Sequence, residues 1–205
     1  DIKINNLFIN SLNIYSNQDL EFSNDNIIKE ISNFLADRFK YYCKEKNLRY
    51  DIIEAVTNSF DLNKVSTNFE KAKSLNKVIN KPIGEDIVSS YKRASNILNS
   101  EIKNINENLS NTTDPGIFKS DFEKTLFKKT KQLKEYFSGV SNRENYDETL
   151  VFLASSKKEI FDFFDNVKVN DDSEIVKKNR LELLNFFCKT FDNFIDFKFI
   201  KDIHE

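Results

Sequence analysis

The chain has 205 residues, 39% of them hydrophobic and 20 of them Phe, which is enough to build the core of one large folded domain. A formal net charge of -2 and a pI of about 5.7 exclude nucleic-acid binding through bulk positive charge, so such binding requires local basic faces. Only 3 Gly and 2 Pro interrupt the chain, and this favours long helices over short strands joined by tight turns.

Apolar residues recur at three- and four-residue steps in the first half of the chain and predict helices there. The first pattern covers residues 27–42, with Ser23 and Asp25 as candidate N-caps. A short helix is expected over residues 51–58, and Asp61 is expected to cap the third pattern.

Two breaks separate the helical patterns that follow. They are KPIG at residues 81–84 and NTTDPG at residues 111–116. A buried stripe at residues 87–98 lies between them, and a long helical pattern at residues 118–137 comes after the second. Gly139 stands where a helix terminator is expected.

The last part of the chain predicts a helical corner. Asn145 or Asp147 is a candidate cap for a short helix, and aromatic residues at helical spacing then stop at Phe164. The segment VKVNDD follows, and the spacing Asp171-x-x-Glu174 resembles a capping box that starts the last long helix. With no strand pairs and no internal repeat, the sequence predicts an all-α helical bundle of about seven to nine helices.

We expect residues 1–22 to be a remnant of a preceding domain or a linker, and residues 23–205 to form the helical domain, with a subdomain break near 111–116. Cys43 and Cys188 fall within amphipathic patterns and are expected to be core residues in a reducing compartment. No apolar run approaches the roughly 18 residues needed to span a bilayer, and no signal peptide is visible, so we expect a cytoplasmic protein. Because the sequence begins without Met, we expect it to be a piece of a longer chain.

Catalytic and metal-binding patterns are weak. The one histidine, His204, is next to the last residue, and the three glycines are isolated from one another, so no His-based site and no phosphate-binding loop is expected. A set of acidic residues occupies a helix end and a helix start, where capping is favoured over a magnesium site. Its members are Asp162, Asp165, Asp171 and Asp172. We expect no catalytic residue, metal site or cofactor in this chain.

Two groups of residues are candidates for nucleic-acid contact. Lys92, Arg93 and Asn96 share the helical face opposite the buried stripe, where cations hold phosphate and an amide reads a base edge. Arg49 and Tyr50, in the joint LRYD, offer a guanidinium and a ring for stacking on an unpaired base. An ordinary solvated face is the alternative for the first group, and a packed Tyr50 is the alternative for the second.

Two more basic stripes occur at helical spacing, and each alone is more typical of a solvated face than of a site. The first consists of Lys124, Lys128 and Lys131, and the second of Lys177, Lys178 and Arg180. Arg180 is also expected to brace the corner against Asp162 or Asp165.

Three stretches, in order and with compatible spacing, resemble the bacterial glycyl-tRNA synthetase β-subunit family. NFLADRFKYYCKEKNLRYDIIEAV, residues 33–56, is similar to the family pattern F-x-x-[DE]-R … G-x-R-Y-D-[VI]-I-x-A-V. YKRASNIL, residues 91–98, is similar to the family's NKRVSNIL. YDETLVFLASSKKEIFDFFDNVKVNDDSEIVKKNRLELL, residues 146–184, is similar to its carboxy-terminal segment.

This resemblance implies a helical anticodon-binding domain of the DALR type, from the carboxy-terminal part of a longer β subunit. It further implies glycine tRNA and a separate α subunit as partners, with ATP and Mg²⁺ used by the whole glycine–tRNA ligase rather than by this fragment. By matching position it carries over Lys92-Arg93 with Ser95-Asn96, Arg49-Tyr50-Asp51 and Asn179-Arg180. Together with Lys177 of the second basic stripe, the tRNA-binding candidates are Lys92, Arg93, Asn96, Arg49, Tyr50, Lys177 and Arg180.

Two other functions stay open on the residues alone. A helical protein-docking module without nucleic-acid binding would use exposed Phe side chains to bind a partner helix, and it suits the net charge of -2. A magnesium-dependent helical enzyme that uses the acidic residues 162–172 is a more distant alternative.

Overall fold

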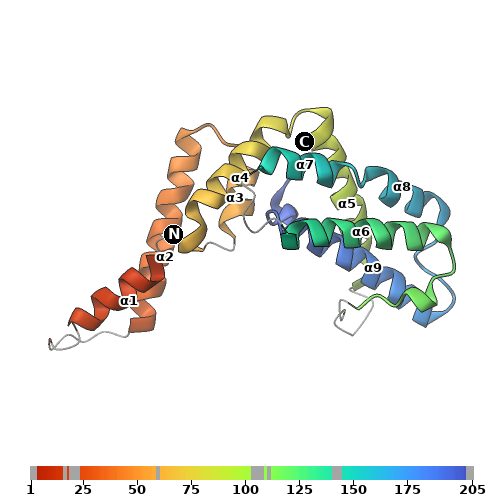
Figure 1. Cartoon of the computed structure of the whole chain (residues 1–205), viewed down its shortest axis with the longest axis horizontal. Helices are drawn as coiled ribbons and strands as arrows, with labels where there is room; N and C mark the ends of the chain where they lie inside the picture. The colour runs from red at the N-terminus through yellow and green to blue at the C-terminus, as the bar shows by residue number, and fades with distance from the viewer. Residues whose placement is uncertain are drawn as a thin grey trace. The chain divides into compact units, whose positions relative to one another are not determined.

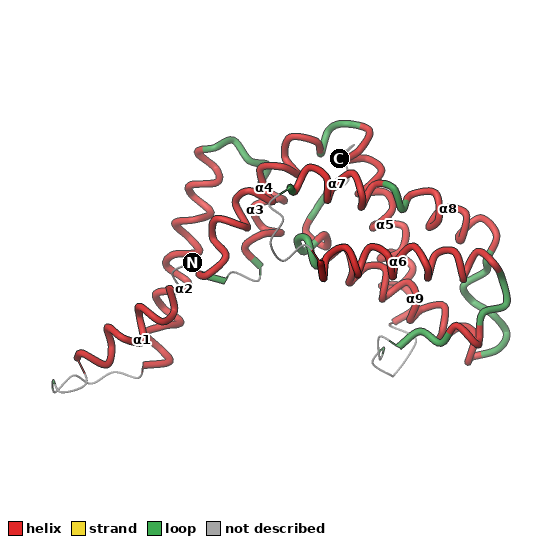
Figure 2. Tube along the Cα trace, in the orientation of Figure 1, coloured by secondary structure: helices red, strands yellow, loops and turns green. Residues whose placement is uncertain are grey.

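The computed structural model describes residues 4–15, 18, 24–58, 61–102, 109, 112–139 and 145–201. Within these ranges every regular element is a helix and none is a strand, as Figure 2 shows, which confirms the predicted all-α class. The chain divides into two compact units, Asp1–Lys73 and Ser74–Glu205. This division does not fall at residue 22 or near residues 111–116, and the domain boundaries expected there stay predictions.

Among its described residues, the first unit contains three α-helices, a short 3-10 helix and most of a fourth α-helix (Figure 1). They are α1 (Ile4–Tyr15), α2 (Asn24–Glu45), α3 (Tyr50–Thr57), η1 (Leu62–Lys64) and α4 (Val65–Val78). Helix α2 packs against α1 and α3, and its buried Phe39 and Cys43 belong to the same core as Ile52 and Ile53 of α3. As expected, Asp61 caps the start of η1, because its side chain accepts a hydrogen bond from the backbone N–H of Asn63 at 2.9 Å.

The second unit contains the remaining helices. They are α5 (Pro82–Ile102), η2 (Pro115–Ile117), α6 (Asp121–Gly139), α7 (Tyr146–Ala154), α8 (Lys157–Asn166), α9 (Glu174–Asp192) and η3 (Phe197–Phe199). Helix α5 contacts α7, α8 and α9, and α6 contacts α8 and α9. The core between them is aromatic, with Tyr91, Phe163, Phe187, Phe191 and Phe197 almost wholly buried. Each such side chain contributes roughly 1.5–3 kcal/mol by burial, so these rings stabilise the second unit.

Several predicted helix ends agree with the structure. Helix α6 ends at Gly139, and Asn145 rather than Asp147 caps α7, since the Asn145 side chain accepts from the backbone N–H of Glu148 at 3.2 Å. Asp25 lies inside α2, which begins at Asn24, and Ser23 lies outside the described residues.

The predicted capping box at the start of α9 is wrong. The N-cap is Ser173, and its side chain makes no capping hydrogen bond. Asp171 instead accepts from the backbone N–H of Ser173 at 3.0 Å and pairs with basic side chains of other segments.

Candidate nucleic-acid interface

Helix α5 presents one polar face, as its sequence predicts. Tyr91, Ala94 and Leu98 are buried at 2%, 0% and 5% exposure, which turns the opposite side of the helix outward. On that side Lys92 is partly exposed and Asn96 is exposed. Neither side chain has an ion pair or hydrogen bond within the part of the chain that the structure describes, so both are available to a ligand.

Arg93 is held differently from its neighbours on α5. Its guanidinium carbon lies 4.5 Å from the ring centroid of Phe161 and 5.2 Å from that of Phe164. One guanidinium nitrogen donates to Asp165 at 2.7 Å, so α8 fixes both the plane and the direction of the group. The side chain keeps 35% exposure, and the α5 cation is therefore preorganised on an aromatic surface rather than mobile.

Lys157 extends this cationic and aromatic surface, and sequence reasoning missed it. Its ammonium lies 5.6 Å from the Phe161 ring centroid and 2.6 Å from a carboxylate oxygen of Asp86. The helical spacing could have indicated the contact between Lys157 and Phe161, since these residues are one turn apart on α8. Phe161 itself is partly exposed.

Arg49 and Tyr50 lie in the first unit, at the joint between α2 and α3. Asn47 takes a left-handed conformation with φ of 57°, and the extended backbone of Arg49 then starts α3. Both oxygens of the buried Asp51 carboxylate accept from the Arg49 guanidinium, one of them at 2.8 Å from Nε. Tyr50 is 61% exposed, with the Lys44 ammonium 5.6 Å from its ring centroid, so its ring is open to stacking.

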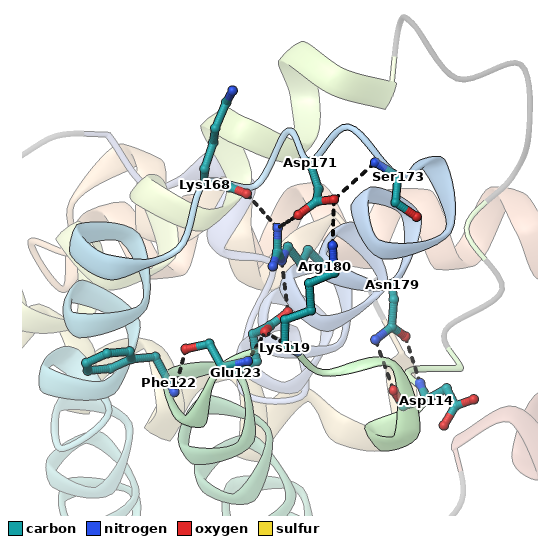
Figure 3. A network of polar contacts seen from close by, with 10 residues as sticks. Asp114, Lys119, Phe122, Glu123, Lys168, Asp171, Ser173, Asn179 and Arg180 are labelled. Atoms are coloured by element: carbon teal, nitrogen blue, oxygen red, sulfur yellow. Dashed lines mark hydrogen bonds and ion pairs between the residues drawn. The ribbon is translucent and has the colours of Figure 1, made fainter.

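Lys177 and Arg180, the remaining candidates, are bound by carboxylates of this chain. The Lys177 ammonium is 2.9 Å from Glu101, and both side chains are largely buried. Arg180 is 5% exposed and donates through Nε to Glu123 at 2.8 Å. Its Nη1 donates to the Lys168 carbonyl at 2.8 Å and to Asp171 at 2.9 Å (Figure 3).

The partners predicted for Arg180 are therefore wrong. Asp165 pairs with Arg93 on α5, and Asp162 pairs with Lys158 one turn earlier on α8. Arg180 faces the start of α6 and the segment after α8 instead, so it does brace the corner, but against other residues.

A network of polar contacts surrounds Arg180 and fixes three segments to α9 (Figure 3). Glu123, which is 0% exposed, accepts through its second oxygen from the backbone N–H groups of Lys119 and Ser120 and so caps α6. Asn179 bonds both the N–H and the carbonyl of Asp114, at 2.8 and 3.0 Å. The corner before α9, the start of α6 and the segment before η2 thus share one rigid frame.

Asp171 is a second carboxylate of this network. Its carboxylate accepts from the Lys119 ammonium at 2.9 Å and from the Ser173 N–H, and these bonds lower the pKa of Asp171 to about 2. Asp162, Asp165 and Asp171 are thus used in ion pairs with cations of this chain. Among the described residues, no group of three His, Cys, Asp or Glu side chains is placed to hold a metal ion. The described helices include none with both the length and the apolar character that a membrane span requires.

The second unit, with a lysine, a fixed arginine and an amide along one helix, has the features of a helical nucleic-acid-binding domain. The family model of the DALR anticodon binding domain matches residues 87–198, which is more than half of the chain, and the chain belongs to this family. This match confirms the DALR-type resemblance seen in the sequence.

Relatives of the chain carry one name, glycine–tRNA ligase beta subunit. The chain is 32% identical over 197 residues to that protein of Rickettsia prowazekii (strain Madrid E), covering 94% of this chain and 28% of the relative. It is 33% identical over 169 residues to that of Sulfurihydrogenibium sp. (strain YO3AOP1), covering 82% and 24%. The chain therefore spans between about a quarter and a third of the length of these relatives.

Proposed function

We propose that the chain binds the anticodon arm of glycine tRNA as part of a glycine–tRNA ligase β subunit. The observation that carries this proposal is the family match at residues 87–198, because it includes α5 with its outward Lys92 and Asn96. The name that these relatives carry, glycine–tRNA ligase beta subunit, supports glycine as the amino acid.

Each exposed candidate has a chemical role in this proposal. The Lys92 ammonium contacts a phosphate as a point charge, and the Asn96 amide pairs with a base edge. Arg93, held against Phe161 and Phe164, offers its remaining donors with little further loss of side-chain freedom on binding. Tyr50 stacks on an unpaired base.

The other three candidates contribute indirectly. Arg49, Lys177 and Arg180 each hold a carboxylate of the chain, and we assign them to shaping the surface rather than to direct contact with tRNA. In the whole ligase we expect an α subunit as partner, and ATP and Mg²⁺ to act at a site outside this chain.

A docking module is the second candidate function, and exposed apolar side chains in the first unit favour it. These are Leu7, Ile9, Ile14 and Tyr15 on α1 and Phe34 on α2. A docking module that binds its partner mainly through exposed Phe side chains is less well supported, because most Phe side chains are at least partly buried. Among the described residues, the Phe side chains with large exposure are Phe34, Phe122 and Phe199.

Titration of the chain with a glycine anticodon stem-loop tests the proposal. A second stem-loop with the second and third anticodon bases changed is measured beside it, at two salt concentrations, because affinity for nucleic acid depends on salt. Tighter binding to the glycine anticodon is the expected result. Equal and salt-sensitive binding of the two RNAs would show that the chain contacts phosphates without reading the anticodon bases. No binding to either RNA would favour the docking module.

A further inference from the structure

A pocket of about 440 Å³ opens between α6 and α9, which lie side by side in Figure 1, and the segment before η2. Its lining includes Thr113, Phe127, Lys131, Lys134, Glu135 and Phe186. None of the candidates on α5 lines it. The volume falls within the range of roughly 300–1,000 Å³ that is usual for small-ligand pockets.

Two aromatic rings, each with a cation over it, form one side of this pocket. The centroids of Phe127 and Phe186 are 6.0 Å apart. The Lys131 ammonium lies 5.7 Å from the Phe127 centroid, and the Lys134 ammonium lies 5.3 Å from that of Phe186. Both lysines are exposed and both rings are partly exposed, so each ring has a face that a flat ligand can reach.

Two of the oxygen-bearing side chains that line the pocket offer hydrogen bonds to a ligand. The Thr113 hydroxyl oxygen is buried and has no hydrogen-bond partner within the described ranges. A buried polar group without a partner is costly, so a ligand that bonds it gains affinity. Glu135 is exposed at the same site and places an acceptor carboxylate beside the lysines. Two positive charges against one negative charge favour a ligand that carries a phosphate.

We propose that this pocket binds one unpaired nucleotide of an RNA strand. The base stacks on Phe127 or Phe186, the lysines contact the flanking phosphates, and Glu135 accepts a hydrogen bond from an exocyclic amino group of the base. A base with such an amino group, for example cytosine, is then preferred over uracil, which presents a carbonyl oxygen at the same position. The inference rests on the proposed function, since it supplies a second RNA contact apart from the α5 face.

Stacking outweighs the cation–ring contacts that the base must displace. An exposed contact between a cation and an aromatic ring is worth about 2- to 5-fold in affinity. A base stacked on an aromatic side chain is worth about 5- to 150-fold. The flexible lysines therefore move from the rings to the phosphates at a net gain.

The test uses the full chain and two single-stranded RNA pentamers, one of cytidine and one of uridine, followed by fluorescence anisotropy. We expect the cytidine pentamer to bind more tightly, and Glu135→Gln to remove most of this preference, because an amide both donates and accepts. The double substitution Lys131→Gln and Lys134→Gln is expected to weaken the binding of both RNAs. It should also reduce the slope of log affinity against log salt concentration by about 0.7 per charge removed. Thr113→Val is expected to weaken binding about 2- to 10-fold without loss of thermal stability, since it removes a buried, unpartnered hydroxyl.

Lys128→Gln is the matched control, because Lys128 is an exposed lysine of the same helix that does not line the pocket. The inference fails if the wild-type chain binds neither pentamer. It also fails if the pocket variants bind both pentamers with the same affinities as the Lys128→Gln control. Lys92→Gln, measured on the glycine anticodon stem-loop, separates the two proposals. If it weakens stem-loop binding while the pocket variants change nothing, the pocket inference fails alone and the proposed function stands.

Discussion

At the scale of single residues, polar side chains are divided between those that face solvent and those that carboxylates of this chain already bind. Lys92 and Asn96 belong to the first kind, whereas Arg180 and Lys177 are bound to carboxylates. A guanidinium that is bound to a buried carboxylate stabilises the fold and is not available to a phosphate. The accessible residues are consequently the ones whose substitution should change binding without changing stability.

Substitutions on α5 should separate phosphate contact from base reading. Lys92→Gln is expected to weaken the binding of every anticodon stem-loop by a similar factor, and to reduce the slope of log affinity against log salt concentration by about 1. Asn96→Ala is expected to lower discrimination between anticodons by about 1–3 kcal/mol. Both are measured by stem-loop titration with Lys124→Gln as control, since Lys124 pairs locally with Asp121 at the start of α6. Unchanged binding in both variants would refute the assignment of this face.

Arg180 should matter for stability far more than other arginines. Arg180→Met leaves the wholly buried Glu123 without its cation, and we expect a loss of about 3–5 kcal/mol in the free energy of unfolding. Arg93→Met is the control, because its ion pair is partly exposed and is expected to cost about 1 kcal/mol or less. Urea unfolding of both variants gives the comparison, and equal losses would contradict the buried-network account.

Asp171 should make stability depend on pH in the acid range. Its bonds to Lys119 and the Ser173 N–H place its folded pKa at about 2, below the ordinary value of 3.8. Its contribution is therefore full above about pH 4 and is lost as pH falls toward 2. We expect Asp171→Asn to be less stable than the wild type at pH 6 and the difference to shrink toward pH 2, measured by urea unfolding. Asp172→Asn, an exposed neighbour of equal charge, is the control, and a difference that persists at pH 2 would contradict this assignment.

These residue roles were the least predictable part of the molecule. The exposed side of α5 followed from the helical spacing of its buried residues, because periodicity alone determines which side faces inward. The partner of Arg180 did not follow, since Glu123 lies 57 residues away and local sequence carries no information about that contact. Arg93 was correctly placed on the polar face, but its aromatic partners on α8 depend on how two helices pack.

At the scale of elements, the break at KPIG requires a glycine for space rather than for a special backbone angle. A Cβ on Gly84 would overlap the carbonyl oxygens of Val78 and Ile79, where α4 ends close to the first turn of α5. In a helix with free space around the glycine, replacement of Gly by Ala stabilises the folded protein by about 1 kcal/mol. We expect Gly84→Ala to destabilise instead, by roughly 1–3 kcal/mol, because the overlap is with rigid backbone. Thermal unfolding decides the sign, and a stabilised variant would show that α4 and α5 have room to separate.

Helices were predictable as elements because each buries one apolar stripe, and most expected spans correspond to helices in the structure. The start of α9 was an exception. Asp171 and Glu174 have the spacing of a capping box, but the Asp171 carboxylate bonds to Arg180 and Lys119 as well as to the Ser173 N–H. A tertiary ion pair thus overrode a local capping pattern, and spacing alone does not reveal that competition.

At the scale of the whole molecule, a chain of net charge -2 is proposed to bind a polyanion. This requires that acidic residues be neutralised internally while some cations stay outward. Asp165, Asp162 and Asp171 meet this condition through pairs with Arg93, Lys158, Lys119 and Arg180. Local charge, and not the net value, is therefore the relevant quantity for the proposed binding of RNA.

Footprinting of full-length glycine tRNA by the chain tests the central claim most directly. Hydroxyl-radical cleavage of the tRNA backbone is compared with and without protein, at one moderate salt concentration. Binding of the anticodon arm predicts protection of the anticodon loop and the adjoining stem, with the acceptor stem cleaved as in free tRNA. Protection centred on the acceptor stem, or a cleavage pattern unchanged by saturating protein, would contradict it.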